Sequence, residues 1–285
     1  MARGVLKIGN EKMTEYKASL SALLLSLMSH RELLRRLASR EFSMRFRGSV
    51  LGFAWTIVTP LVLAVMYTFV FDSIFKMRWQ GAGDIGTSNF AIYLLIGLAV
   101  HGVFVECLSR APGLIISNPS YVTKVVFPLE VLPFVVLITA LTNAMISLTI
   151  AALVNLALTG QLHPTALFIP ILVLPYALFV VAATMIFAAI GVYLRDLSQV
   201  VSLVIPMSLF LSPVFYPIEA VPRAMQPLIS MNPLTFVIEQ ARLALITGNA
   251  PNLMGIAIYT TASMCALTVA YWSFQRLRTG FADVV

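Results

Sequence analysis

Residues 131–158 read VLPFVVLITALTNAMISLTIAALVNLAL, and this apolar run decides the fold class. It contains no charged residue, and its few polar side chains are Thr, Asn and Ser. About 20 apolar residues are enough for an α-helix to cross the roughly 30 Å hydrocarbon core of a bilayer. Because the apolar residues are continuous rather than alternating, the run predicts a transmembrane helix and not a strand of a barrel.

The composition of the whole chain supports the same class. Of its 285 residues, 59% are hydrophobic and 11% are charged, against about 45–50% and about 25% in ordinary soluble domains. So few charges could not cover the surface of a soluble fold of this length. The chain is therefore expected to be an all-α polytopic membrane protein.

Six apolar runs predict six transmembrane helices, at about 51–71, 90–108, 131–158, 166–194, 200–214 and 253–274. We expect one membrane domain over 30–285, preceded by an N-terminal cytoplasmic segment over 1–29. With the N-terminus inside, the outer segments hold only Lys76, Arg78, Arg223 and Arg242 of the 19 basic residues. This bias predicts a multi-pass membrane protein with both termini cytoplasmic. It also explains the net charge of +7 without a nucleic-acid partner.

A basic amphipathic helix is predicted over 30–47, directly before the first span. Its apolar face holds Leu33, Leu34, Leu37, Ala38 and Met44, and its opposite face holds Arg31, Arg35, Arg36, Arg40 and Arg47. Glu32 and Arg36, and likewise Glu41 and Arg45, have the spacing of ion pairs within one helix. Such a helix suits the inner interface. It is either an anchor that sets topology or a platform for a cytoplasmic partner.

The 109–130 segment, SRAPGLIISNPSYVTKVVFPLE, follows the second span on the cytoplasmic side. Pro112-Gly113 should end that span, and a short helix is expected between the later breakers. Its apolar residues Ile115, Ile116, Tyr121 and Val122 are expected to remain uncovered, which favours a docking element over a plain connector.

Residues 212–233 contain Pro213, Pro217, Pro222, Pro227 and Pro233, and a helix is expected over 235–247. Neither part is long enough to span, so this region should dip into the outer leaflet and return. We interpret it as re-entrant helices of an outer gate rather than a simple loop. The candidate gate residues are Pro217, Glu219, Arg223, Pro233, Glu239 and Arg242.

Few other polar residues fall in the spans: His101, Glu106, Asn143 and Asn155. They are expected to make interhelical hydrogen bonds, with a functional role as the alternative. The sequence has no P-loop, no metal-ligand cluster and no catalytic cluster. It predicts no catalytic residue, metal or cofactor in this chain.

Residues 40–71, REFSMRFRGSVLGFAWTIVTPLVLAVMYTFVF, resemble the permease subunits of bacterial ABC exporters for polysaccharides such as O-antigen, capsule and teichoic acid. The matching positions here are Arg45, Phe46, Arg47, Ser49, Leu51, Gly52, Trp55 and Pro60. The resemblance continues at Asn118, Lys124, Phe127, Pro128, Arg195-Asp196, Ser212-Pro213 and Asn232-Pro233.

The resemblance implies an ABC exporter transmembrane domain over 30–285. It implies a homodimer with two copies of a separate cytoplasmic ATPase, which would hold the ATP and Mg. The cargo would be a lipid-linked polysaccharide, most simply of O-antigen type. The ATPase-coupling interface would comprise Arg36, Arg40, Arg45, Arg47, Asn118, Tyr121, Lys124, Phe127, Arg195 and Asp196. The first and fifth spans would line a conduit, with Trp55, Tyr67, Phe210, Phe215 and Tyr216 as the candidate aromatic residues.

Two other functions remain open at this point. An ABC permease for a drug or another lipid would keep the fold and would not need the aromatic residues. A secondary transporter or flippase running on an ion gradient would need intramembrane carboxylates, internal repeats and more spans, which the sequence does not show.

Overall fold

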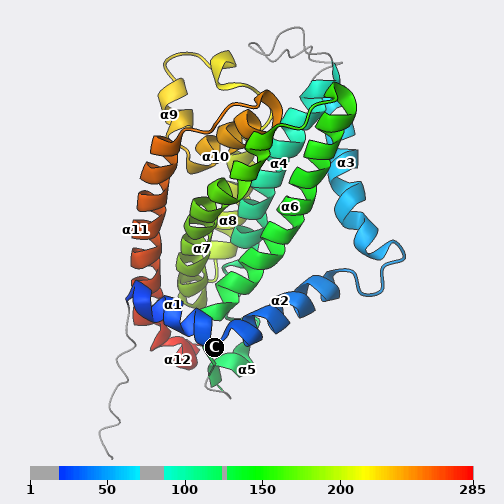
Figure 1. The fold of residues 1–285 in the computed structure, drawn as a ribbon. Coiled ribbons are helices and arrows are strands. Elements are labelled where there is room, and N and C mark those ends of the chain that lie inside the picture. The colour runs from blue at the N-terminus through cyan, green and yellow to red at the C-terminus, as the bar shows by residue number, and fades with distance from the viewer. Residues whose placement is uncertain (1–18, 71–86, 124–126, 285) are drawn as a thin grey trace, which may run out of the picture.

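A computed structural model of the chain describes residues 19–70, 87–123 and 127–284 (Figure 1). Within these ranges every regular element is a helix, and no strand occurs. Four helical stretches are long and apolar enough to cross a membrane: Phe90–Arg110, Val131–Thr159, Pro164–Tyr193 and Leu253–Arg278. The expectation of an all-helical membrane protein is confirmed.

These stretches form helices α4 (Thr87–Arg110), α6 (Val131–Thr159), α7 (Ile169–Tyr193) and α11 (Leu253–Arg278). Local residues fix several of their ends. Gly160 closes α6 with a φ of 70°, a left-handed conformation that suits glycine. The Asn252 side chain begins α11 by accepting a hydrogen bond from the Gly255 backbone at 3.0 Å.

The core lies where these four helices pack as two pairs, α4 with α6 and α7 with α11. Its fully buried side chains include Leu94, Met185 and Phe274. Tyr176 also lies in this core, and its hydroxyl donates to the Val100 backbone carbonyl at 2.7 Å. A buried hydroxyl in an apolar core needs such a partner.

Two shorter apolar helices lie against α4: α3 (Trp55–Thr68), preceded by a 3-10 turn (Gly52–Ala54), and α8 (Leu197–Leu211). They correspond to the first and fifth predicted spans. The predicted end of the fifth span at 214 is wrong, because α8 ends at Leu211 and Ser212 is extended. The proline at 213 explains this, since it disfavours a helical conformation at the residue before it. The count of six spans stays a prediction.

The remaining helices lie at the two ends of the bundle (Figure 1). One end carries α1 (Leu20–Ser29), α2 (Arg31–Arg45), α5 (Pro119–Thr123) and α12 (Phe281–Val284). The opposite end carries α9 (Gln226–Ser230) and α10 (Pro233–Arg242). The first and last described helices therefore share one end. The described part of the predicted segment 1–29 includes α1, which buries Leu23 in the main core.

At the opposite end, α10 packs against α4 and α7 and is fixed by its last residue, Arg242. The Arg242 side chain is buried and donates to the backbone carbonyls of Tyr93 at 3.0 Å, Pro213 at 2.6 Å and Val214 at 2.9 Å. It also donates to Glu239 at 3.0 Å. One guanidinium thus links α10 to α4 and to the residues that follow α8.

Gly97 on α4 leaves the space that this arrangement requires. A Cβ at Gly97 would lie 3.0 Å from Arg242 Nη2 and 3.2 Å from the Val214 Cα. Separations this small are tighter than ordinary packing, so any side chain at position 97 would displace the guanidinium or the backbone after α8.

We predict that Arg242→Ala destabilises the protein strongly. It leaves the Pro213 and Val214 backbone carbonyls without this donor, at about 1–3 kcal/mol for each buried group left unpaired. The apparent melting temperature in detergent should fall by about 5 °C or more. Arg223→Ala is the matched control, because Arg223 is exposed in the segment that joins α8 to α10. Equal melting temperatures for the two variants would contradict this role for Arg242.

Candidate functional site

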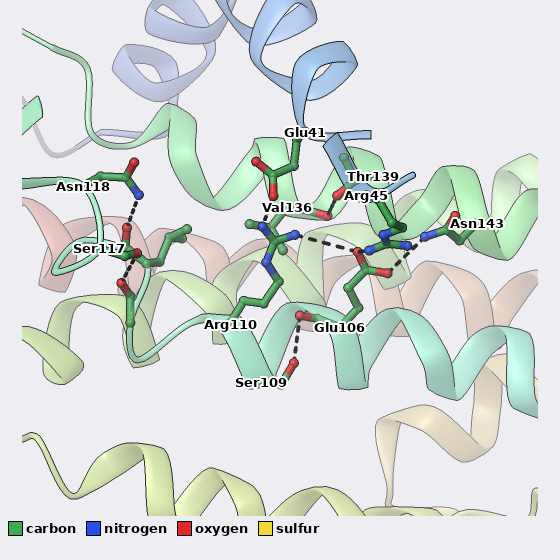
Figure 2. A network of polar contacts seen from close by, with 12 residues as sticks. Glu41, Arg45, Glu106, Ser109, Arg110, Ser117, Asn118, Val136, Thr139 and Asn143 are labelled. Atoms are coloured by element: carbon green, nitrogen blue, oxygen red, sulfur yellow. Dashed lines mark hydrogen bonds and ion pairs between the residues drawn. The ribbon is translucent and has the colours of Figure 1, made fainter. Parts of the chain in front are cut away.

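A shared carboxylate, Glu106 on α4, joins three helices near the end that carries α2 and α5 (Figure 2). Its Oε1 accepts a hydrogen bond from Nη2 of Arg45, the last residue of α2. Its Oε2 accepts one from Nδ2 of Asn143 on α6 at 3.1 Å. The Glu106 side chain is only 17% exposed. The two donors therefore stabilise a partly buried charge.

Arg110 makes a second link between α2 and α4. Its Nη2 donates to Oε1 of Glu41 on α2, and its Nη1 lies 3.9 Å from Glu106 Oε1. Charges alternate along this contact in the order Glu41, Arg110, Glu106, Arg45 (Figure 2). Each charge has an opposite charge beside it, which offsets the cost of partial burial. We call these four residues and Asn143 the α2–α4–α6 network.

Of the two ion pairs predicted within α2, the structure confirms one and contradicts the other. Glu32 and Arg36 pair as predicted, with 3.6 Å between nitrogen and oxygen. The predicted pairing of Glu41 with Arg45 is wrong, since both side chains bond to α4 instead. Helical spacing allowed the pair, but α4 offers opposite charges in a less exposed place. Ion pairs gain strength as water is excluded from around them.

The 109–130 segment folds largely as predicted. Helix α4 ends at Arg110, before Pro112-Gly113, and the short helix α5 begins with Pro119. The Tyr121 ring stacks on the Phe127 ring with 4.3 Å between centroids and 9° between planes. The prediction that Ile115 is uncovered is wrong, because Ile115 is buried in the main core. The segment turns back onto the bundle there, which its apolar composition alone could not show.

Close packing and hydrogen bonds fix the 109–130 segment to the bundle. A Cβ at Gly191, near the end of α7, would overlap the backbone of Pro112. Arg278 at the end of α11 donates to the Phe127 carbonyl at 2.8 Å and to Glu130 at 2.9 Å. Ser26 of α1 donates to the other oxygen of Glu130 at 2.7 Å. Motion of this segment would therefore move the ends of several helices.

A cavity of about 420 Å³ opens between α2, the 109–130 segment and α6. Three predicted coupling residues line it, Arg40, Asn118 and Tyr121, and Arg40 Nη2 lies 3.5 Å from the Tyr121 hydroxyl oxygen. Ser198 at the start of α8 also lines it, just after the exposed Arg195-Asp196 turn. The remaining predicted coupling residues are placed as follows: Arg36 and Arg47 are exposed, Arg45 belongs to the α2–α4–α6 network, Phe127 is buried, and Lys124 lies outside the described residues.

Four of the five predicted conduit aromatics gather where α3 and α8 end. Phe215 lies against both Tyr67 and Phe210, with ring centroids 5.1 Å and 6.1 Å away. The Tyr216 hydroxyl donates to the Phe210 carbonyl at 2.6 Å. Trp55 is separate, at the other end of α3, where it lines a cavity of about 380 Å³ beside Arg45 and Asn143. Phe210 is exposed, whereas Phe215 is buried among its neighbours.

The predicted outer-gate residues divide into two groups. Glu219 and Arg223 are exposed between α8 and α10. Pro217 is buried, and Pro233 begins α10 after Asn232, whose side chain accepts from the Leu234 backbone at 3.0 Å. Arg242 and Glu239 form the buried link described above.

The intramembrane polar residues make interhelical contacts, as expected. His101 on α4 lies 2.9 Å from the Ser208 hydroxyl on α8, and Glu106 joins α2 to α6 through the network. Asn155 on α6 donates to the Leu245 carbonyl at 3.3 Å. Among the described residues, no group of three or more His, Cys, Asp or Glu side chains could hold a metal ion. The arrangement suits mechanical coupling between helices.

Sequence reasoning did not assign Glu41, Glu106, Arg110 and Asn143 to the site. Three of them are charged residues within or next to the apolar runs. Such residues rarely lack a partner. That signal could have identified them as candidates for one network, although not their pairing.

Comparison with known proteins gives the class of this one. Residues 32–246 match the family model described as ABC-2 type transporter. That match includes α2 apart from Arg31, the 109–130 segment and α10, and the chain therefore belongs to the ABC-2 type transporter family.

Similarity to individual proteins points to a narrower group within this family. The chain is 29% identical to the O-antigen export system permease protein RfbA of Myxococcus xanthus, over 92% of this chain and 99% of the relative. It is 24% identical to the protein of the same name in Klebsiella pneumoniae, over 89% of this chain and 95% of the relative. It is also 24% identical to the polysialic acid transport protein KpsM of Escherichia coli, over 73% and 79% of the two chains.

We predict that Glu106→Gln weakens the network measurably, whereas Glu32→Gln does not. Glu106 has partners on two other helices and is mostly buried, so its loss should cost about 1–3 kcal/mol. The Glu32–Arg36 pair is largely exposed, and a pair of this kind contributes only about 0.3–0.5 kcal/mol. Thermal unfolding of the purified variants would measure the difference. A Glu32→Gln variant as unstable as Glu106→Gln would contradict this ranking.

Proposed function

We propose that this protein is the membrane-spanning permease subunit of an ATP-driven exporter that moves a lipid-linked polysaccharide out of the cytoplasm. The observation that carries the proposal is the similarity to polysaccharide export permeases over nearly the whole chain, including both ends of the bundle. A polysaccharide of O-antigen type is the cargo that these relatives favour.

In this proposal the chain crosses the inner membrane six times, with α3 and α8 as its shortest spans. The shared end of α1 and α12 is cytoplasmic, in agreement with the excess of basic residues predicted there. Two copies of this chain assemble with two copies of a cytoplasmic ATPase, which supplies the ATP and Mg sites. The broken helices α9 and α10 then re-enter the outer leaflet as the outer gate.

The coupling proposal rests on the α2–α4–α6 network. The ATPase would contact α5, Arg36 and Arg40 of α2 and the Arg195-Asp196 turn. Force applied to α2 would pass through Arg45 and Glu41 to α4, and through Asn143 to α6. These contacts include charge-assisted bonds in a partly water-excluded place, so they would resist sliding better than exposed pairs do.

The cargo proposal rests on α3 and α8. Their outward residues include Val65, Phe69, Leu203, Met207 and Phe210, all of which are exposed in the single chain. Facing a second copy, these residues would enclose a conduit that ends at the Phe210–Phe215–Tyr67 cluster. Aromatic rings suit a sugar polymer, because they pack against the apolar C–H faces of sugar rings while the hydroxyls stay hydrated.

Co-expression with the candidate ATPase, followed by ATP hydrolysis and polysaccharide export in proteoliposomes, tests this proposal. We expect a stable complex with ATP-dependent export of the lipid-linked polymer. Export that follows an ion gradient without any ATPase would contradict it, and so would ATP-driven transport of small hydrophobic compounds without the polymer.

Within that complex, Tyr121→Glu should reduce both ATPase binding and export at least about tenfold, since it places a charge in the stacked Tyr121–Phe127 pair at the proposed contact. Ser230→Glu is the matched control, because Ser230 is exposed on α9 at the opposite end. Co-purification yield and export rate are the measurements. Normal coupling in Tyr121→Glu would contradict the proposed docking surface.

A further inference from the structure

The two flanks of α2 are chemically different. One flank faces the 109–130 segment, where Arg40 and Glu41 line the 420 Å³ cavity and both have polar partners. The other flank, together with α6, forms a separate groove of about 390 Å³. That second groove takes no part in the coupling proposed above.

The floor of this α2–α6 groove is apolar and its rim is basic. Leu34, Ala38 and Phe42 of α2 and Ile138 of α6 provide the apolar lining. Arg31 and Arg35, one helical turn apart, stand exposed at one end of it. No acidic side chain lines the groove.

Arg31 and Arg35 also differ from the other arginines of α2 in their partners. Arg36 pairs with Glu32, Arg45 pairs with Glu106, and Arg40 lies 3.5 Å from the Tyr121 hydroxyl. Over the ranges that the structure describes, neither Arg31 nor Arg35 lies within ion-pair distance of an acidic group. Two neighbouring like charges on one helix face repel each other, and a bound anion would remove that cost.

We propose that the α2–α6 groove is a binding site for an anionic phospholipid of the membrane leaflet on the α2 side. The headgroup phosphate binds Arg31 and Arg35, since guanidinium groups match phosphate oxygens in geometry and charge. The first part of an acyl chain covers Leu34, Phe42 and Ile138. A basic amphipathic helix at the interface lies at the depth where both parts of such a lipid are present.

The apolar floor distinguishes this occupant from a free phosphate, which would leave that floor uncovered. Ala38 also packs with Val131 and Val135 of α6, so a lipid in the groove adds to the same α2–α6 contact. Its binding would therefore stabilise the position of α2 on the bundle. The site does not depend on which cargo the protein carries.

Native mass spectrometry of the full-length protein in detergent, titrated with phosphatidylglycerol or phosphatidylcholine, tests this site. Arg31→Gln/Arg35→Gln should weaken phosphatidylglycerol binding about 30-fold, because each arginine contributes about 1 kcal/mol. Phosphatidylcholine binding should not change. Arg36→Gln/Arg276→Gln removes the same charge from exposed arginines outside the groove and should retain phosphatidylglycerol affinity.

Ser39→Trp provides a second test that leaves the charge unchanged. Ser39 is exposed and lines the groove, so an indole there should block the lipid without disturbing the core. Loss of phosphatidylglycerol binding in both groove variants, with the control intact, is the expected result. Equal affinities in all variants, an equal loss in the control, or displacement of phosphatidylglycerol by an equimolar polyprenyl phosphate would each overturn the proposal.

Discussion

The end of the bundle that carries α2 depends on the hydrogen bonds and ion pairs of the Glu106 carboxylate. It receives donors from Arg45 and Asn143, and Arg110 beside it binds Glu41 in turn. Without a negative charge at that point, Arg45 and Arg110 would face each other near an apolar bundle with no compensating group between them. The interface helix α2 would then be held on α6 mainly by a few small apolar contacts, such as those of Ala38.

At the opposite end of the bundle, the buried Arg242 side chain has a comparable role. Arg242 donates to the Tyr93 carbonyl of α4 and to two carbonyls of the chain after α8, and it thereby fixes α10 against the bundle. Each end of the protein thus carries short helices that a few polar side chains bind to the long helices or to the chain beside them. Irregular backbone at membrane depth is stable only when it is satisfied in this way. The long helices α4, α6, α7 and α11 provide the packed core between the two ends.

Much of the fold could be predicted from the sequence, because lipid imposes a length and an apolar composition that are easy to see. The helix over 131–159 and the start of α11 at residue 253 agree with their predicted positions to within a residue. The short helix at Pro119 followed from its flanking breakers. The end of α8 was misplaced because its apolar run continues past the point where Pro213 already prevents the helix.

The site was less accessible to sequence reasoning. Spacing within α2 suggested that Glu41 pairs with Arg45, whereas both side chains bond to α4, which only the tertiary packing reveals. The buried position of Ile115 and the separation of Trp55 from the other aromatics also depend on how the chain folds back on itself. Such pairings are set by neighbours distant in the sequence, and helical periodicity carries no information about them.

If the α2–α4–α6 network transmits force, α2 and α4 move as one unit during transport. Cross-linking in an Arg45→Cys/Glu106→Cys variant tests this joint motion. The variant also carries Cys107→Ser and Cys265→Ser, and a short bifunctional thiol reagent links the two introduced thiols. The unlinked double variant lacks the ion pair and should export poorly, and linking should restore ATP-driven export toward the wild-type rate. If linking blocks export while the unlinked variant is active, α2 has to separate from α4 during transport, which contradicts the joint motion of the two helices.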